Sequence, residues 1–201
     1  MKKNNNTYAI IGLGNPGTHY SNTRHNIGQK IVNQYLDKHN TKYKKQNNLL
    51  VAAMQMQEKQ IFCLQSTEFL NNSGKSYSEF IKKENIQNNK IILIADDIDF
   101  EVGKLSIQKS KSHGGNNGIK SLFNYINNDP LIRIRIGVGR PNFDGKESFD
   151  PEEVSKWVLS KPSKQEENNL KKILEQAILS IDSIIEFGID FTMNKFNGLH
   201  Q

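Results

Sequence analysis

Cysteine is almost missing from this sequence, since Cys63 is the single one among 201 residues. A lone cysteine excludes a disulfide within the chain and a zinc cluster built on cysteine ligands. Because Cys63 lies in the apolar run 61–64, we expect it to be a buried strand residue. This cysteine usage fits a protein of the reducing cytoplasm.

Long apolar runs are missing as well. No stretch approaches the roughly 18 apolar residues that a membrane helix needs. The first apolar run, residues 8–13, is too short for the core of a secretory signal. We therefore expect a soluble protein without a membrane partner. The length is typical of one compact domain, so we expect residues 1–201 to form a single domain.

Basic residues exceed acidic ones. Lysine and arginine number 27 against 21 acidic residues, which gives a formal net charge of +6. Such a surplus favours a polyanionic partner, although many basic proteins bind no nucleic acid. Charge alone therefore leaves the partner open.

Apolar periodicity alternates between strand-like and helical segments along the chain. Strand-like runs occupy residues 8–13, 49–56, 60–65, 91–95, 105–108 and 132–138. Helical spacing occupies residues 27–36, about 73–83, 118–126 and the stripe from 170 to 185. The alternation predicts an α/β fold with one mixed, mostly parallel sheet between helices, an αβα sandwich. The polar, turn-rich segment 141–151 is too short for a domain linker.

A glycine-rich turn follows the first strand-like run. Its sequence, Gly12-Leu13-Gly14-Asn15-Pro16-Gly17, matches the dinucleotide fingerprint G-x-G-x-x-G. That fingerprint needs a helix that begins within the glycines, so that its first amides hold pyrophosphate. Residues 18–26 are instead polar and aperiodic. We therefore interpret the glycines as a tight turn and expect no cofactor, with a nicotinamide oxidoreductase kept as an alternative.

His25 and Asp96 are candidates for proton transfer. His25 lies in a loop after the glycine turn, and its ordinary pKa lets it accept a proton at neutral pH. A lone loop histidine is more often a plain surface residue. Asp96-Asp97-Ile98-Asp99 ends a strand, where a carboxylate points into the crevice of an α/β sheet and is able to orient a histidine. The alternative for these acids is a magnesium site, but no phosphate-binding loop accompanies them.

Two stretches are rich in side-chain amides, at residues 69–74 and 113–118. Asparagine or serine before a helix is usually an N-cap. Side-chain amides can also donate to a developing oxyanion. The sequence contains no G-x-S-x-G elbow and no Cys–His pairing, so we expect water to be the nucleophile.

Taken together, the motifs resemble those of the bacterial-type peptidyl-tRNA hydrolase family. They are GLGNPG-x-x-Y-x-x-TRHN-x-G, F-x-N-x-SG, DD-x-D, HGG-x-NG and R-x-RIG-x-G, in this order. The similarity runs from about Tyr8 through the C-terminal helix. It implies a hydrolase that cleaves the ester between a peptide, or another N-blocked aminoacyl group, and tRNA. We expect a cytoplasmic monomer without a metal ion or other cofactor.

The resemblance also implies roles for individual residues. His25 matches the catalytic base, Asp96 the acid that supports it, and Asn15 the asparagine that helps to select N-blocked substrates. Further positions match residues that line the groove for the peptide and the 3′ end of the tRNA, namely Tyr20, Phe69, Asn71 and Asn117. Of these, the two asparagines also match positions that hold the water or the carbonyl.

Two stretches depart from the family pattern. In the first, Leu70 replaces a methionine and Gln65-Ser66 replaces a usual Lys-Pro. In the second, the Gly-rich loop, Asn116 replaces a histidine that the family often has. The leading alternative function is a tRNA- or RNA-binding module without catalytic activity. The tRNA body would lie on the surface, where candidate phosphate contacts are Lys104, Lys109, Lys111, Lys120 and Arg135, the last of which could instead pair with an acid.

Overall fold

A seven-stranded sheet forms the centre of the protein. In the computed structural model, which describes residues 6–127 and 129–197, the strand order is β2-β3-β4-β1-β5-β7-β6. The strands are β1 (Thr7–Gly12), β2 (Lys44–Gln46), β3 (Leu49–Met56), β4 (Lys59–Ser66), β5 (Ile91–Asp97), β6 (Leu105–Ser110) and β7 (Leu131–Gly137). The neighbours β4, β1, β5 and β7 are parallel, whereas β3 and β6 run in the opposite direction.

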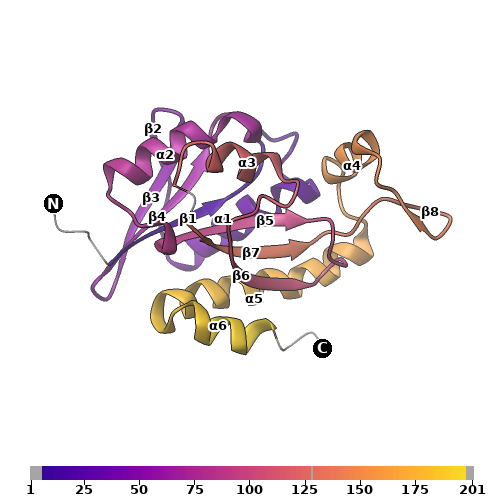
Figure 1. Cartoon of the computed structure of the whole chain (residues 1–201). Coiled ribbons are helices and arrows are strands. Elements are labelled where there is room, and N and C mark those ends of the chain that lie inside the picture. The colour runs from indigo at the N-terminus through magenta and orange to yellow at the C-terminus, as the bar shows by residue number, and fades with distance from the viewer. Residues whose placement is uncertain (1–5, 128, 198–201) are drawn as a thin grey trace.

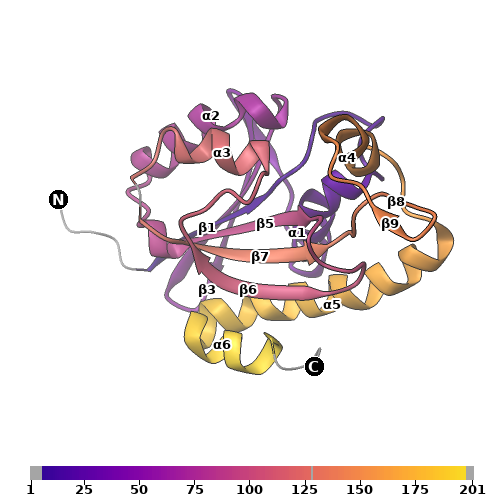
Figure 2. The same cartoon turned by 45° about the vertical axis from the view of Figure 1, so that its right-hand side comes forward.

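Helices cover both faces of this sheet (Figures 1 and 2). One face packs against α1 (Ile27–Lys38), α5 (Lys164–Phe187) and α6 (Ile189–Phe196). The other face packs against α2 (Gly74–Lys83) and α3 (Asn117–Phe123). The predicted fold class, an α/β sandwich with one mixed and mostly parallel sheet, is confirmed.

The core consists of two apolar layers, one on each side of the sheet. Successive side chains of a strand point to opposite faces. In β1, Ile10 therefore packs into the layer beneath α1 and α5, while Ala9 and Ile11 pack into the layer beneath α2 and α3. The predicted apolar stripe of the long C-terminal helix belongs to the first layer, and Cys63 is buried in β4, as expected.

Some elements were not predicted. The segment 141–151, which was expected to be turn-rich, carries a hairpin, β8 (Asn142–Phe143) with β9 (Lys146–Glu147). The helix α4 (Pro151–Val158), which begins at the end of this segment, was not predicted. Asp150 caps α4 by accepting the N–H groups of Glu152 and Glu153. The short strand β2 and the final helix α6 were also missed, and α3 ends three residues earlier than expected. Among the described residues, no helix has the length and apolarity required to span a bilayer.

Gly28 allows α1 to approach the strands closely. A Cβ atom at this position would lie 2.3 Å from the carbonyl oxygen of Ile94 and 2.8 Å from the nitrogen of Leu13, so no side chain fits. The contact is continued by the N–H of Gln29, which donates to the oxygen of Leu13 over 3.2 Å. The start of α1 is thereby fixed against the carboxyl ends of β1 and β5.

We expect Gly28→Ala to lower the free energy of unfolding by about 3 kcal/mol or more, because the added methyl group would push α1 away from backbone atoms that cannot yield. Denaturant unfolding measures this loss. Asn33→Ala, at an exposed position of the same helix, should change stability by less than about 0.5 kcal/mol. Equal stability of Gly28→Ala and wild type would show that the contact is not tight in solution.

Candidate active site

A pocket of about 680 Å³ opens at the carboxyl ends of the central strands. Its walls come from the turn after β1, the segment after β4, the end of β5, the start of α3 and the helix α4. Ligand sites of open α/β sheets usually lie at this edge. Every site residue that was predicted from the sequence lines the pocket, namely Asn15, Tyr20, His25, Phe69, Asn71, Asp96 and Asn117.

His25 and Asp96 form a hydrogen-bonded pair in this pocket. His25 lies in a short 3-10 helix, Arg24–Asn26, directly before α1, and its Nδ1 is 2.8 Å from Oδ1 of Asp96 on β5. The side chains are 15% and 4% exposed, respectively. Because an ionised carboxylate only accepts hydrogen bonds, Nδ1 must carry the proton. The other ring nitrogen, Nε2, is then the one that can accept a proton.

The pKa of His25 is raised above its ordinary value of 6.5. Burial acts against the charged imidazolium and lowers the pKa, but the negative charge of Asp96 and its hydrogen bond outweigh this effect. The pair therefore stabilises the protonated imidazole.

The other acids at the end of β5 have separate partners. Asp97 accepts a hydrogen bond from Nε of Arg135 over 2.6 Å, and Asp99 accepts one from Arg140 over 2.5 Å. Asp96, Asp97 and Asp99 therefore do not converge, and the described residues contain no cluster of three metal-ligating side chains. The magnesium alternative has no support in this arrangement. Arg135, one of the candidate phosphate contacts, is engaged by an acid.

The glycine turn packs against the loop of His25. Asn26 is buried, and its Oδ1 accepts the backbone N–H of Asn15. Its Nδ2 donates to the backbone carbonyl oxygen of Asn15 and to the side-chain Oε1 of Gln29. Gly14 lies so close that a Cβ atom there would be 2.9 Å from Cγ of Asn26. Gly14 thus gives room for the side chains of Asn26 and Gln29. Since α1 begins only at Ile27, no helix amide is available within the turn for a dinucleotide.

Asn15 is itself fixed in one orientation. Its Oδ1 accepts the backbone N–H of Leu70 over 3.1 Å. With the oxygen engaged, the side-chain NH₂ group is the half of the amide that remains for the pocket.

Aromatic and amide side chains form the opposite wall. The rings of Tyr20 and Phe69 meet edge to face with centroids 6.1 Å apart, and Phe69 is 53% exposed. Asn71 and Asn117 are both exposed, the first in a 3-10 turn and the second at the first position of α3. This wall offers apolar surface and polar amide groups side by side.

Arg24 holds α4 in place, a role that sequence reasoning did not find. Its buried guanidinium donates to both carboxylate oxygens of Glu166 over 3.0 and 2.8 Å, and it stacks on Trp157 of α4 at 3.6 Å. It also donates to the hydroxyl of Ser160 and to the carbonyl oxygen of Lys161. Arg24 precedes His25 directly, so the same short segment fixes the histidine and one wall of the pocket.

Comparison with known proteins identifies the family. A family model described as peptidyl-tRNA hydrolase matches residues 9–201. The chain belongs to the peptidyl-tRNA hydrolase family. It is 37% identical over 192 residues to the peptidyl-tRNA hydrolase of Clostridium beijerinckii, covering 95% of this chain and 96% of that protein. With the peptidyl-tRNA hydrolase of Alkaliphilus metalliredigens it shares 38% identity over 192 residues, covering 95% and 100% of the two chains.

Solved structures agree with this assignment. A crystal structure of peptidyl-tRNA hydrolase from Acinetobacter baumannii matches with a TM-score of 0.87 and 28% sequence identity, covering 96% of this chain and 95% of the other. The family and the class of enzyme predicted from the motifs are therefore confirmed.

Leu70, one of the departures from the family motifs, is buried and packs against Gly118. A Cβ atom at Gly118 would lie 2.5 Å from the Leu70 side chain.

We expect the pair of Arg24 and Glu166 to make stability pH-dependent. Burial opposes ionisation of Glu166, but hydrogen bonds from Ser163 and Arg24 outweigh it and lower its pKa below 4.5. A lowered pKa adds stability above the unfolded-state value, and this stability is lost as the pH falls through the folded-state value. Glu166→Gln keeps a capping acceptor and removes the charge, so at pH 7 it should cost about 2 kcal/mol of unfolding free energy.

Denaturant unfolding from pH 7 down to pH 3 measures this effect. The difference between wild type and Glu166→Gln should shrink as the pH falls below about 4.5. The matched control is Glu167→Gln, which removes the same charge from an exposed side chain of the same turn and should cost little. Equal losses in the two variants would mean that the contact with Arg24 adds no stability.

Proposed function

We propose that the protein hydrolyses the ester bond between the ribose of tRNA and a peptide or another N-blocked aminoacyl group. The observation that carries the proposal is the 2.8 Å contact between Nδ1 of His25 and Asp96 in a pocket lined by amide donors. Membership of the peptidyl-tRNA hydrolase family supports the choice of substrate. No bound group is needed for this chemistry.

In the proposed reaction His25 acts as a general base. A water molecule attacks the ester carbonyl carbon while Nε2 of His25 takes its proton, and Asp96 stabilises the imidazolium that forms. The carbonyl electrons move onto oxygen, and side-chain NH₂ groups of Asn71 or Asn117 stabilise the oxyanion. When the tetrahedral intermediate collapses, the ribose oxygen leaves and takes the proton back from His25. The products are a peptide with a free carboxyl group and a reusable tRNA.

Asn15 supports a preference for N-blocked substrates. Since its Oδ1 accepts from Leu70, the side chain presents a donor to the pocket. An N-acyl carbonyl oxygen accepts from such a donor. The ammonium group of an unblocked aminoacyl-tRNA can only donate. It would face the side-chain NH₂ group of Asn15, which also donates, and neither group would find an acceptor.

The pocket also has surfaces for the two arms of the substrate. Apolar groups of Phe69, Val154 and Val158 line it and would pack against peptide side chains. The segment 102–127 borders it at the start of α3 and contains four lysines and no acidic residue, which suits tRNA phosphates. One chain provides all of these groups, so we propose that the protein acts as a monomer. We also propose that it acts in the cytoplasm.

Hydrolysis of N-acetyl-aminoacyl-tRNA, scored as free tRNA, tests the proposal directly. We expect turnover by wild type and a loss of at least about 100-fold in His25→Ala, with tRNA affinity nearly unchanged. Asp96→Asn should lower kcat far more than it changes KM, because the substrate does not bind to this carboxylate.

Asp97→Asn is the matched control, since it makes the same change at the next residue, whose carboxylate pairs with Arg135 and accepts the N–H of Asp99 instead of contacting His25. It should retain most of the activity. A wild-type protein that binds tRNA without releasing product would identify the chain as a binding module instead. A larger loss in Asp97→Asn than in Asp96→Asn would remove the pair with His25 from the mechanism.

Salt dependence tests the basic segment. We expect log kcat/KM for full-length N-acetyl-aminoacyl-tRNA to fall with log salt by roughly 0.7 to 0.9 per phosphate contact. A short 3′-terminal fragment should show a shallower slope. Lys109 is paired with Asp190 over 2.8 Å, so Lys111 and Lys120, which are both exposed, are the better positions to change.

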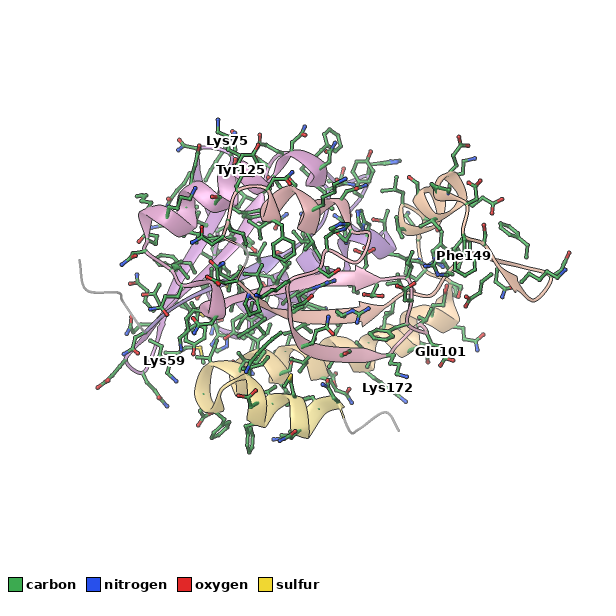
Figure 3. All side chains as sticks on the ribbon, viewed as in Figure 1. Lys59, Lys75, Glu101, Tyr125, Phe149 and Lys172 are labelled. Carbon is green, nitrogen blue, oxygen red and sulfur yellow. The ribbon has the colours of Figure 1, made fainter. Side chains whose placement is uncertain are left out.

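Lys111→Ala and Lys120→Ala should each reduce the slope for full-length tRNA. Lys172→Ala is the control, because Lys172 lies on α5, on the opposite side of the sheet from α3 (Figure 3). Its slope should equal that of wild type. If the tRNA and the fragment share one shallow slope, the basic segment does not hold the tRNA body.

A further inference from the structure

Asn116 contacts the acid of the proposed catalytic pair. Its Nδ2 lies 3.2 Å from Oδ1 of Asp96, the same oxygen that receives Nδ1 of His25 over 2.8 Å. Asn116 belongs to the Gly-rich loop, residues 111–116 between β6 and α3, which is distant in sequence from both partners. The loop is thereby connected to the pair through one carboxylate oxygen.

The orientation of the Asn116 side chain is fixed by a second set of bonds. Asn116 is the N-cap of α3, and its Oδ1 accepts the backbone N–H groups of Gly118 and Ile119 over 3.0 and 3.3 Å. Backbone N–H groups can only donate, so the amide oxygen must face the helix. The NH₂ group must then face Asp96. Rotating the amide would leave the helix N-terminus without a cap and turn an oxygen toward a carboxylate.

The donor from Asn116 has a specific effect on the acid. Asp96 is 5% exposed, so hydrogen bonds from the protein take the place of water at its carboxylate. A second donor restricts rotation of the carboxylate and offsets part of its negative charge. Both effects reach His25, because the same oxygen accepts from its ring.

Within the described part of the chain, few other charged groups lie near the pair of His25 and Asp96. Asp97 points to Arg135, and Arg24 is engaged by Glu166. The negative charge of Asp96 attracts the guanidinium of Arg133 on β7. Arg133 also donates a hydrogen bond to the carbonyl oxygen of Ser112 in the Gly-rich loop. His113 lies in that loop as well, exposed, with its Nδ1 accepting the N–H of Gly115. Asn116 is therefore the uncharged contact through which the loop acts on Asp96.

We propose that Asn116 is a positioning residue, which uses the N-cap of α3 to hold the carboxylate of Asp96 against Nδ1 of His25. This inference rests on the hydrolysis proposed above and assigns a function to a position where the chain departs from the family motif. Asn116 does not itself need to contact the reacting atoms. Its effect is on the geometry and the proton affinity of the histidine.

Two substitutions separate this function from the cap. Asn116→Ser keeps a capping oxygen but has no donor that reaches Asp96. Asn116→Asp keeps the cap and the shape but replaces the donor with a second negative charge. We expect kcat to fall about tenfold in Asn116→Ser, and further in Asn116→Asp, with little change in KM.

The decisive measurement is the protonation of His25. Without the donor, Asp96 keeps more of its negative charge and favours the imidazolium, so the acid limb of kcat/KM should move to higher pH. We expect a shift of about half a unit in Asn116→Ser and a larger one in Asn116→Asp. NMR titration of the His25 ring in the free protein should show the same order without any substrate. The control is His113→Ala, because His113 lies in the same loop and does not contact Asp96. Its acid limb of kcat/KM should lie at the same pH as that of wild type.

The outcomes distinguish the two proposals. An inactive wild type would refute the hydrolysis, while the NMR titration would still decide the effect of Asn116. An active wild type whose His25 titrates identically in both Asn116 variants would overturn the inference. A rise in KM alone would also overturn it, since it would assign Asn116 to substrate binding.

Discussion

The close contact between α1 and the ends of β1 and β5 is the constraint on which the rest of the site depends. At Gly28 the helix lies against the backbone of Leu13 and Ile94 with no space for a side chain. His25 precedes this contact by three residues, and Asp96 follows Ile94 by two. A buried carboxylate stabilises an imidazolium most strongly at hydrogen-bond distance, and rigid elements hold such a distance better than a mobile loop does. The close contact of α1 with β1 and β5 therefore holds Nδ1 of His25 at 2.8 Å from Oδ1 of Asp96.

Each residue of the Thr-Arg-His-Asn segment serves this arrangement differently. The Thr23 hydroxyl donates to the carbonyl oxygen of Tyr20 and tightens the turn before the histidine. Arg24 reaches outward to Glu166 and Trp157, and Asn26 reaches back to Asn15. A buried guanidinium is costly unless it is paired, so its several acceptors are a condition for placing it beside the pocket. The histidine is thus held by neighbours that point in three directions.

Periodicity predicted the main strands and helices because their apolar residues follow the strand and helix repeats over four or more positions. The hairpin β8–β9 escaped because its strands are two residues long. The helix α4 contributes no buried residue. Its apolar positions Val154, Trp157 and Val158 span little more than one turn, and its other sequence signals are Asp150 before Pro151 and two glutamates in the first turn. Among the site residues, the lining positions followed from the motifs. The contacts of Arg24 and Asn116 join segments far apart in the chain, and local sequence carries no sign of them.

Because α4 is weakly buried, this helix can separate from the sheet more easily than the core elements can. Its main attachments are the stacking of Trp157 on Arg24 and the bonds from the indole N–H to the carbonyl oxygens of Val138 and Gly139. Separating α4 from the sheet would expose little apolar surface, so its local opening costs far less than unfolding the two core layers. The pocket thus combines a stiff floor, which carries the histidine and the aspartate, with one compliant wall. Such a wall can yield to groups of different size while the floor keeps Nδ1 of His25 aligned with Asp96.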